Sequence, residues 1–185
     1  TAFGSGTIAG GNNSTAFGNS TSASSFDATA FGKNTFASGN ISVAFGEGTK
    51  AYGNTSTSFG RETEASGNYS TSFGDSTIAS GNSSTAFGKE SEASGTASTA
   101  FGRETEANGN YSTAFGVGTE ASRNSAFIVG AYNVPDTNIL FGIGSGTSSS
   151  NKQNAMYVIE QFHPLPASFI AYNSYFRGNV TPMTN

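Results

Sequence analysis

The sequence predicts an all-β protein, a parallel β-solenoid made of 14-residue coils with two strands each. A Phe-Gly pair recurs at every fourteenth residue from Phe3 to Phe115, without insertion or deletion. An Ala column with the same period runs from Ala9 to Ala121. Gly and Asn recur between these columns, and both residues tolerate the positive φ angles that tight turns need. Repetition at a short fixed period indicates one structural unit stacked on itself.

Stacking of the coils turns each repeated position into a ladder. Equivalent residues of neighbouring strands lie about 4.8 Å apart, so the repeat predicts a rod roughly 43 Å long. The expected Phe ladder consists of Phe3, Phe17, Phe31, Phe45, Phe59, Phe73, Phe87, Phe101 and Phe115. The expected Ala ladder consists of Ala9, Ala23, Ala37, Ala51, Ala65, Ala79, Ala93, Ala107 and Ala121.

The composition excludes several classes of protein. The chain of 185 residues has 25 Gly and abundant Ser, Thr and Asn, which is typical of disordered low-complexity chains. Disorder places no demand on register, however, and the strict period argues against it. Cys is absent, which excludes disulfides and thiolate sites. The formal net charge of −4 disfavours nucleic-acid binding. No apolar run reaches the length of about 18 residues that a membrane span needs.

Each coil is expected to contain two five-residue strands separated by turns, for example residues 98–102 and 105–109. Side chains alternate across a strand. In the second strand, Thr105 and Ala107 therefore share an inner face, and Glu106 and Asn108 share a solvated outer face. The turns carry Gly, Asn and most of the charges.

The first strand of the coil has no charge on either side in any of the repeats. Thr99 and Phe101 share one side, and Ser98, Ala100 and Gly102 share the other. A strand without charge on either side is typical of one that is covered on both faces. A single slim solenoid covers only its inner face. The chain is therefore expected to associate with itself through this strand.

The word STAFG-x-x-T-x-ASGN-x, which recurs over residues 1 to about 130, resembles the 14-residue head repeat of trimeric autotransporter adhesins, the YadA-like head. The resemblance implies a left-handed parallel β-roll, three chains around a common axis, and an extracellular adhesive or fibrous role. The same head repeat occurs in phage tail fibres. This sequence uses Phe where many heads use Ile. It contains no coiled-coil stalk or membrane anchor of the autotransporter type, so both a bacterial adhesin and a phage fibre stay open.

A parallel homotrimer raises the question of which side of the first strand faces the threefold axis. A large Phe opposite a small Ala is expected to fill a narrow coil, so we place the Phe ladder inside each chain. Ala100 and its equivalents then face the axis. On this assignment Ala100→Glu blocks assembly, and Phe101→Ala destabilises each chain by about 3 to 5 kcal/mol.

The repeat decays after its ninth Phe, which predicts three regions. Residues 1–130 form the β-roll, with Val129 in the Phe column, and Pro135 is expected to end it. Residues 131–160 are expected to form a connector of two strands joined by a polar loop at residues 145–154. Residues 161–185 are rich in aromatic residues and Pro and are expected to form a cap or an arm. The chain opens in mid-repeat at Thr1, which suggests a fragment or a processed piece.

Catalytic chemistry has little support in the sequence, and we expect neither an enzyme nor a cofactor. The one histidine, His163, has no second ligand or base near it in the sequence. Glu62 and Glu64 resemble a pair of catalytic carboxylates, but their place beside a turn predicts solvated side chains. The same holds for Glu104 and Glu106. No metal-binding motif is present.

The expected function is attachment, by an extracellular trimeric head that presents a rigid multivalent rod to a host glycan or surface protein. A bacterial cell surface is the expected location, and a virion tail fibre is the alternative. Possible receptor contacts are Tyr69, Tyr111, Tyr172, Tyr175, Phe176 and Arg177, although packing within the turn is the favoured reason for the presence of the first two. An ice-binding solenoid is a further alternative. It needs a flat, exposed Thr array, and we expect both Thr columns to face inward.

Overall fold

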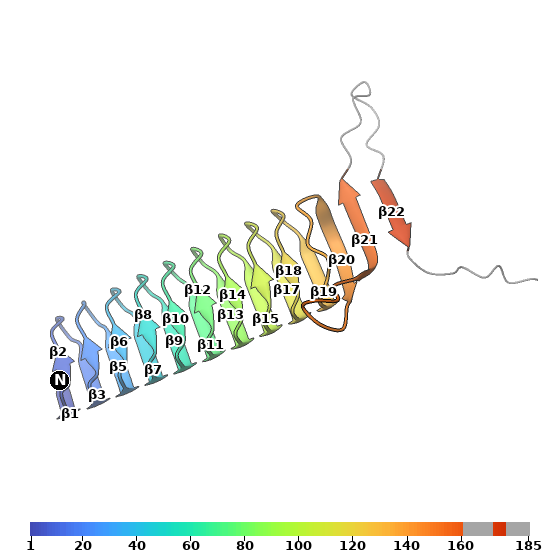
Figure 1. The fold of residues 1–185 in the computed structure, drawn as a ribbon. Helices are drawn as coiled ribbons and strands as arrows, with labels where there is room; N and C mark the ends of the chain where they lie inside the picture. The colour runs from blue at the N-terminus through green and yellow to red at the C-terminus, as the bar shows by residue number, and fades with distance from the viewer. Residues whose placement is uncertain (161–171, 177–185) are drawn as a thin grey trace, which may run out of the picture.

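The computed structural model describes residues 1–160 and 172–176, and it shows a long, straight β-solenoid (Figure 1). Within these residues all regular structure is β-strand. The strands form a 13-stranded sheet and a 9-stranded sheet, which are the two walls of the solenoid. The predicted all-β solenoid with a 14-residue period is confirmed.

The larger sheet contains the long strand of every coil. Neighbouring long strands are parallel, and each residue pairs with the residue 14 positions further on, as Phe87 pairs with Phe101. The long strands are β1 (Ala2–Ser5), β3 (Thr15–Asn19), β5 (Thr29–Lys33), β7 (Val43–Glu47), β9 (Thr57–Arg61), β11 (Thr71–Asp75), β13 (Thr85–Lys89), β15 (Thr99–Arg103), β17 (Thr113–Val117), β19 (Phe127–Ala131) and β20 (Ile139–Ser145).

The smaller sheet is built from strands of only two residues, where the sequence predicted five. These are β2 (Ile8–Ala9), β4 (Ser22–Ala23), β6 (Phe36–Ala37), β8 (Lys50–Ala51), β10 (Glu64–Ala65), β12 (Ile78–Ala79), β14 (Glu92–Ala93), β16 (Glu106–Ala107) and β18 (Glu120–Ala121). The chain turns earlier than expected because the following Gly lies so close to the next coil that a Cβ on it would collide with that coil's backbone, as at Gly67 and Gly81.

Asparagine side chains connect the turns of successive coils. The backbone N–H of Asn54 donates to Oδ1 of Asn68 at 2.9 Å, and that of Asn110 donates to Oδ1 of Asn124 at 2.9 Å. The residue after each of these asparagines has a positive φ, for example 59° at Tyr69. The Asn ladder therefore satisfies backbone donors in a turn whose conformation leaves them unpaired.

In the nine regular coils the interior contains only small side chains, Ala, Ser and Thr, and this overturns the expected position of the Phe ladder. Ala100 and Ala107 are fully buried, whereas Phe101 is 40% exposed. Across the interior, Oγ of Ser58 and Oγ1 of Thr63 lie 2.7 Å apart, so the side chains of the two walls touch directly. Such a cross-section has no room for a Phe ring. The Phe ladder consequently lies outside, and the Ala or Ser before each Phe lies inside.

The C-terminal end of the solenoid differs from the prediction at Pro135. Residues 132–138 contain no short strand, but the long-strand sheet continues in register, because β20 pairs with β19 at the same 14-residue offset. Val129 and Ile143 thus extend the Phe column by two positions. The sheet then ends with two antiparallel strands, β21 (Asn154–Glu160) and β22 (Tyr172–Phe176).

One detail of the interior gives a stability prediction. Thr63 has a hydroxyl partner in Ser58, five residues earlier in the same coil, but the equivalent residue for Thr49 is Ala44, and the buried Oγ1 of Thr49 has no partner within the described chain. We expect Ala44→Ser to stabilise the protein by about 0.5 to 1.5 kcal/mol, because it supplies that hydrogen bond. The reciprocal variant Ser58→Ala removes one and should destabilise by a similar amount. Urea unfolding checks both, and an Ala44→Ser variant that unfolds earlier would contradict the prediction.

Candidate functional site

The most prominent surface feature is the Phe ladder on the outer face of the long-strand sheet. Its nine rings stack almost parallel, with centroid separations of 4.7–5.1 Å and interplanar angles of 3–9°. From Phe17 to Phe115 each ring keeps between 37% and 46% of its surface exposed. Eight such steps make an aromatic stripe about 40 Å long.

A column of Thr side chains runs beside the Phe ladder on the same face. Thr15, Thr57 and Thr71 are exposed, so the expectation that both Thr columns face inward is wrong for this one. The other column, which includes Thr35 and Thr63, is buried as expected. The exposed Thr column lies next to stacked rings, so this face is an aromatic surface and not the flat hydroxyl array that ice binding requires.

The aromatic face changes its column near the C-terminal end of the roll. Phe127 pairs with Thr113 in register, and its ring stacks on that of Phe141 at a centroid distance of 6.0 Å. Val129 and Ile143 occupy the Phe column there. The apolar surface therefore continues past the last Phe of the ladder.

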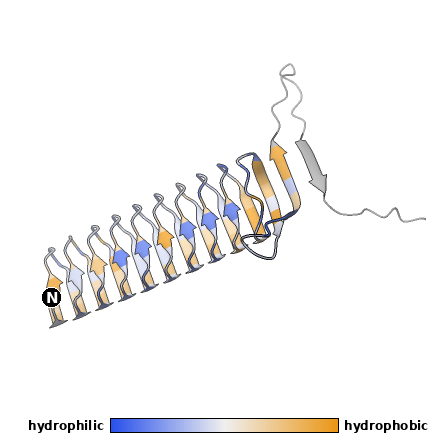
Figure 2. Cartoon of the chain, in the orientation of Figure 1, coloured by the Kyte–Doolittle hydropathy of each residue, from blue (hydrophilic) through white to orange (hydrophobic). Residues whose placement is uncertain are grey.

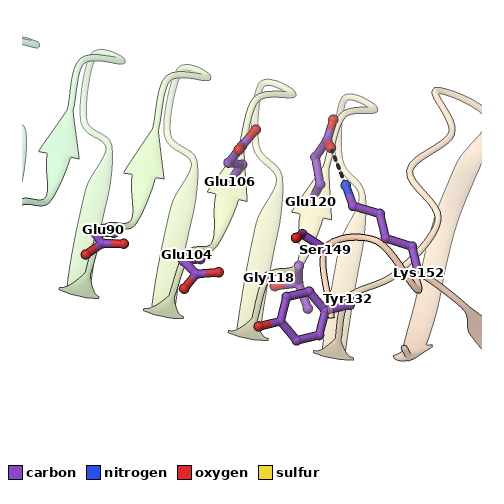
Figure 3. A pocket seen from close by; sticks show the side chains of 9 residues that line it. Glu90, Glu104, Glu106, Gly118, Glu120, Tyr132, Ser149 and Lys152 are labelled. Atoms are coloured by element: carbon purple, nitrogen blue, oxygen red, sulfur yellow. Dashed lines mark ion pairs between the residues drawn. The ribbon is translucent and has the colours of Figure 1, made fainter. Parts of the chain in front are cut away.

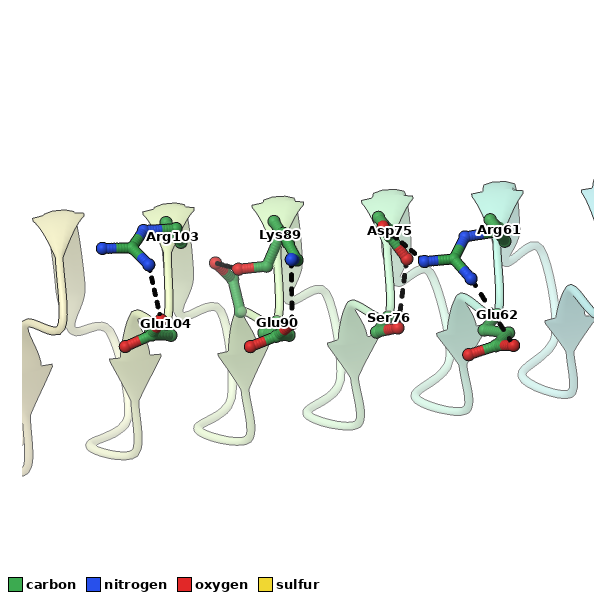
Figure 4. A network of polar contacts seen from close by, with 9 residues as sticks. Arg61, Glu62, Asp75, Ser76, Lys89, Glu90, Arg103 and Glu104 are labelled. Carbon is green, nitrogen blue, oxygen red and sulfur yellow. Dashed lines mark hydrogen bonds and ion pairs between the residues drawn. The ribbon is translucent and has the colours of Figure 1, made fainter.

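Charged side chains stand at the ends of six long strands, two residues after the Phe, and their sign alternates from Lys33 to Lys89 before a second cation follows at Arg103 (Figure 4). Lys33 donates to Glu47 at 2.8 Å, and Arg61 donates to Asp75 at 2.7 Å. These hydrogen bonds from the cations lower the pKa of the Glu47 and Asp75 carboxyls below their ordinary values. The pairs are exposed to solvent, so each contributes little to stability. Sequence analysis missed this column, although the alternating signs at a 14-residue spacing were visible.

The outer face of the short-strand sheet has a different character along its length. Figure 2 shows β6 and β12 as hydrophobic and β14, β16 and β18 as hydrophilic. In the last three of these strands Glu92, Glu106 and Glu120 pair with one another in register. Like charges directly opposite each other destabilise a sheet slightly. Glu92 and Glu106 are exposed to solvent, whereas Glu120 is half-buried and accepts a hydrogen bond from Ser122 at 2.7 Å.

A groove lies where the loop between β20 and β21 folds back over the last coils (Figure 3). Its lining includes Glu104, Glu120, Tyr132, Ser149 and Lys152. Lys152 approaches Glu120 at 3.8 Å, and Arg103 pairs with Glu104 at 2.9 Å. Glu104 and Glu120 therefore each have a cationic partner. Within residues 1–160 and 172–176, no cluster of His, Asp or Glu is suited to a metal ion.

The residues suggested as receptor contacts fall into two groups. Tyr69 and Tyr111 are 66% and 67% exposed, which contradicts packing within the turn as the reason for their presence. Tyr172, Tyr175 and Phe176 belong to β22, of which only the backbone pairing with β21 is described. Arg177 and His163 lie outside the described residues.

The described part of the chain contains no helix with the length and apolar character of a membrane span. A comparison with protein families matches the YadA head domain repeat to residues 1–21, 23–46, 37–63, 65–91 and 93–122. A search of curated proteins finds no significant match. The matched segments cover the solenoid coil after coil, so the family assignment and the Phe ladder concern the same part of the molecule.

Proposed function

Because the chain belongs to the YadA head family, we propose that it is the head of an extracellular trimeric adhesin, which holds a rigid rod against a host glycan or surface protein. The observation that carries the proposal is the exposed Phe ladder. A soluble monomer rarely exposes an apolar patch larger than a few hundred Å². A ladder of nine half-exposed rings about 40 Å long needs a cover.

Three chains with their Phe faces turned toward a common axis cover one another. Each ring then loses the remaining part of its exposure, which contributes on the order of 1 kcal/mol a ring. The sheet face is flat and regular, because every coil repeats the same geometry at the same spacing. Identical faces of this kind suit a closed symmetric assembly. The interface we expected through the Ala side of the strand is thus replaced by one through the Phe side.

Adhesion by such a rod needs no chemistry of its own, and we assign it no catalytic step and no cofactor. The trimer presents every outer surface three times, so contacts that are weak one by one gain avidity. The location that follows is outside the cell, with the rod projecting from a bacterial surface. A β-solenoid fold together with the YadA head repeat is typical of structural adhesins.

The proposal is tested by breaking the ladder without breaking the coil. Phe59→Glu combined with Phe87→Glu should convert a trimer into a folded monomer, because two charges cannot be buried at the axis without partners. Light scattering measures the mass, and circular dichroism checks that the β-structure persists. Phe36→Glu is the control, since Phe36 is 43% exposed on the opposite wall of the solenoid and should leave the trimer intact.

Binding to immobilised glycans and to host-cell surface protein completes this test. The wild-type trimer should bind more tightly than the monomeric variant, since avidity depends on three copies. A wild-type chain that remains monomeric at micromolar concentration contradicts the proposal. Equal binding by the trimer and the monomeric variant contradicts its multivalent part.

A further inference from the structure

Two coils of the solenoid share a pair of residues that the other coils lack. Arg61 ends the long strand of one coil and Tyr69 lies in the turn that closes it; Arg103 and Tyr111 occupy the same two places three coils further on. In the nine coils, Arg ends the long strand only at these two places, and Tyr occupies that turn position only in the same two coils. The two residue types therefore occur together.

The structure of one chain does not account for the tyrosines. Tyr69 and Tyr111 both have a φ of 59°, a conformation that bulky residues rarely adopt and that Asn and Asp tolerate. Ile41 is the one other bulky residue at this position; the remaining coils place Asn13, Asp27, Thr55, Ser83, Ala97 and Ser125 there. Both tyrosine rings are also about two-thirds exposed, so packing does not compensate for the backbone conformation. A large aromatic side chain at this point is thus accessible to a partner outside its own chain.

Arg and Tyr of one coil lie at opposite edges of the Phe face. Arg61 is the last residue of β9, and Tyr69 stands two residues before the start of β11, which runs parallel beside β9. A strand of five residues separates the two edges, a distance of about 16 Å. The two side chains of one chain therefore do not reach each other across the sheet.

A cyclic trimer brings these edges together. When the Phe faces meet at a threefold axis, the strands run around the axis in one sense, so the end of each strand points at the beginning of its neighbour's. The rotation has no translation along the axis, so Arg61 at the end of β9 meets the neighbour's turns that lead into β9 and β11, and Tyr69 lies in the second of these turns. Resting on the trimer proposed above, we propose that Arg61 and Arg103 of each chain stack on Tyr69 and Tyr111 of the next chain and so fix the axial register.

The chemistry of the pair fits a seam between two chains. A guanidinium group over a Tyr ring is attracted by the ring's negative face. Arg61 is already oriented by Asp75 at 2.7 Å, and Arg103 by Glu104 at 2.9 Å, so each cation is held at the strand end before it meets a neighbour. The carboxylates also keep the seam close to neutral.

The Phe ladder by itself does not define how the chains are aligned along the axis. Its rungs are identical, so a slip by one coil loses only one rung of contact. The Arg–Tyr pairs lie three coils apart and are absent from the coils between them. A slip by two coils therefore breaks the Arg61–Tyr69 and Arg103–Tyr111 contacts at once, and the register in which both contacts form is favoured.

Cross-linking tests the geometry of this contact between chains directly. The chain contains no Cys, so introduced thiols are the only ones present. Lys89→Cys with Ala97→Cys introduces thiols at the two edges of one coil that has no Arg–Tyr pair. A short bis-maleimide should link all three chains of the full-length trimer, giving a trimer band on a denaturing gel. Either single Cys variant should stay at monomer mass. A trimer in solution whose double variant does not cross-link overturns the seam while leaving the proposed assembly in place.

Substitution tests the contact itself. The double variant Tyr69→Asn/Tyr111→Asn keeps residues that suit the turn and should lower the Tm of the trimer by several degrees. The double variant Arg61→Gln/Arg103→Gln should lower the Tm by a similar amount. The combined variant should lose little more than either pair alone, because both remove the same contact. Ser83→Asn, at the same turn position without an Arg, is the matched control and should leave the Tm unchanged.

The remaining outcomes are informative as well. Additive losses, or an unchanged Tm in the tyrosine variant, overturn the inference. An unchanged trimer that no longer binds host surfaces also overturns it and assigns the tyrosines to receptor contact. A wild-type chain that is monomeric refutes the proposed assembly first and the seam with it, so the two failures are distinguishable by mass alone.

Discussion

Ala100→Glu should prevent the chain from folding, with no β-sheet circular dichroism signal and no cooperative unfolding transition. Ala100 is fully buried in an interior whose opposite walls are in direct contact. A Glu side chain there has no space, and its carboxylate has no cation or solvent to compensate for burial. An uncompensated buried charge costs about 3 to 5 kcal/mol even where the side chain fits. Here the steric penalty adds to it.

A Glu at the neighbouring position, Phe101, should leave folding intact and impair assembly. Phe101→Glu places the same charge on the exposed face, where it interferes with assembly and leaves the coil folded. Ser80→Glu, on the outer side of a turn, controls for the added charge and should change neither property. An Ala100→Glu chain that folds as a monomer would restore the assignment expected from the sequence, with Ala at the axis and Phe inside.

Gly102→Ala should destabilise the protein by about 3 to 5 kcal/mol, which is more than the roughly 0.5 to 3 kcal/mol that most point mutations cost. Gly102 has a φ of 139°, which L side chains rarely adopt, and a Cβ on it would collide with the carbonyl oxygen of Gly116 in the next coil. Strain of this kind costs about 1 to 3 kcal/mol before the collision is counted. The midpoint of urea unfolding measures the loss.

Gly48→Ala is the matched control for this prediction. Gly48 also has a positive φ, of 67°, but the nearest atom to an added Cβ is the flexible Cγ of Glu62 at 3.4 Å. Other coils place Asn34 and Glu62 at this position with φ near 53°. The variant should therefore lose about 1 kcal/mol or less. Equal effects at Gly48 and Gly102 would show that backbone conformation alone, and not the approach of the next coil, sets the cost.

The repeat by itself determined the architecture of this protein. An uninterrupted 14-residue period leaves one solution, in which each coil pairs with the next at a constant offset, and the observed pairing of Phe87 with Phe101 has that offset. The alternation of a strand also correctly placed Thr99 and Phe101 on one side and Ala100 on the other. Gly and Asn located the turns, because the Gly stands where the next coil approaches closely and the Asn side chain accepts a hydrogen bond from the turn of the preceding coil.

Only the tertiary structure decided which of the two sides is the inside. Both sides of the long strand are uncharged, so their polarity does not distinguish core from surface, and the larger residue looks like the better core residue. The distance between the walls settles the matter, and it is set by coil length: 14 residues close a loop so narrow that Ser58 reaches Thr63 at 2.7 Å. A cross-section filled by Ala, Ser and Thr leaves Phe no place except the outer face. The same side chains that seemed to build the core therefore form the surface through which the chain is proposed to assemble.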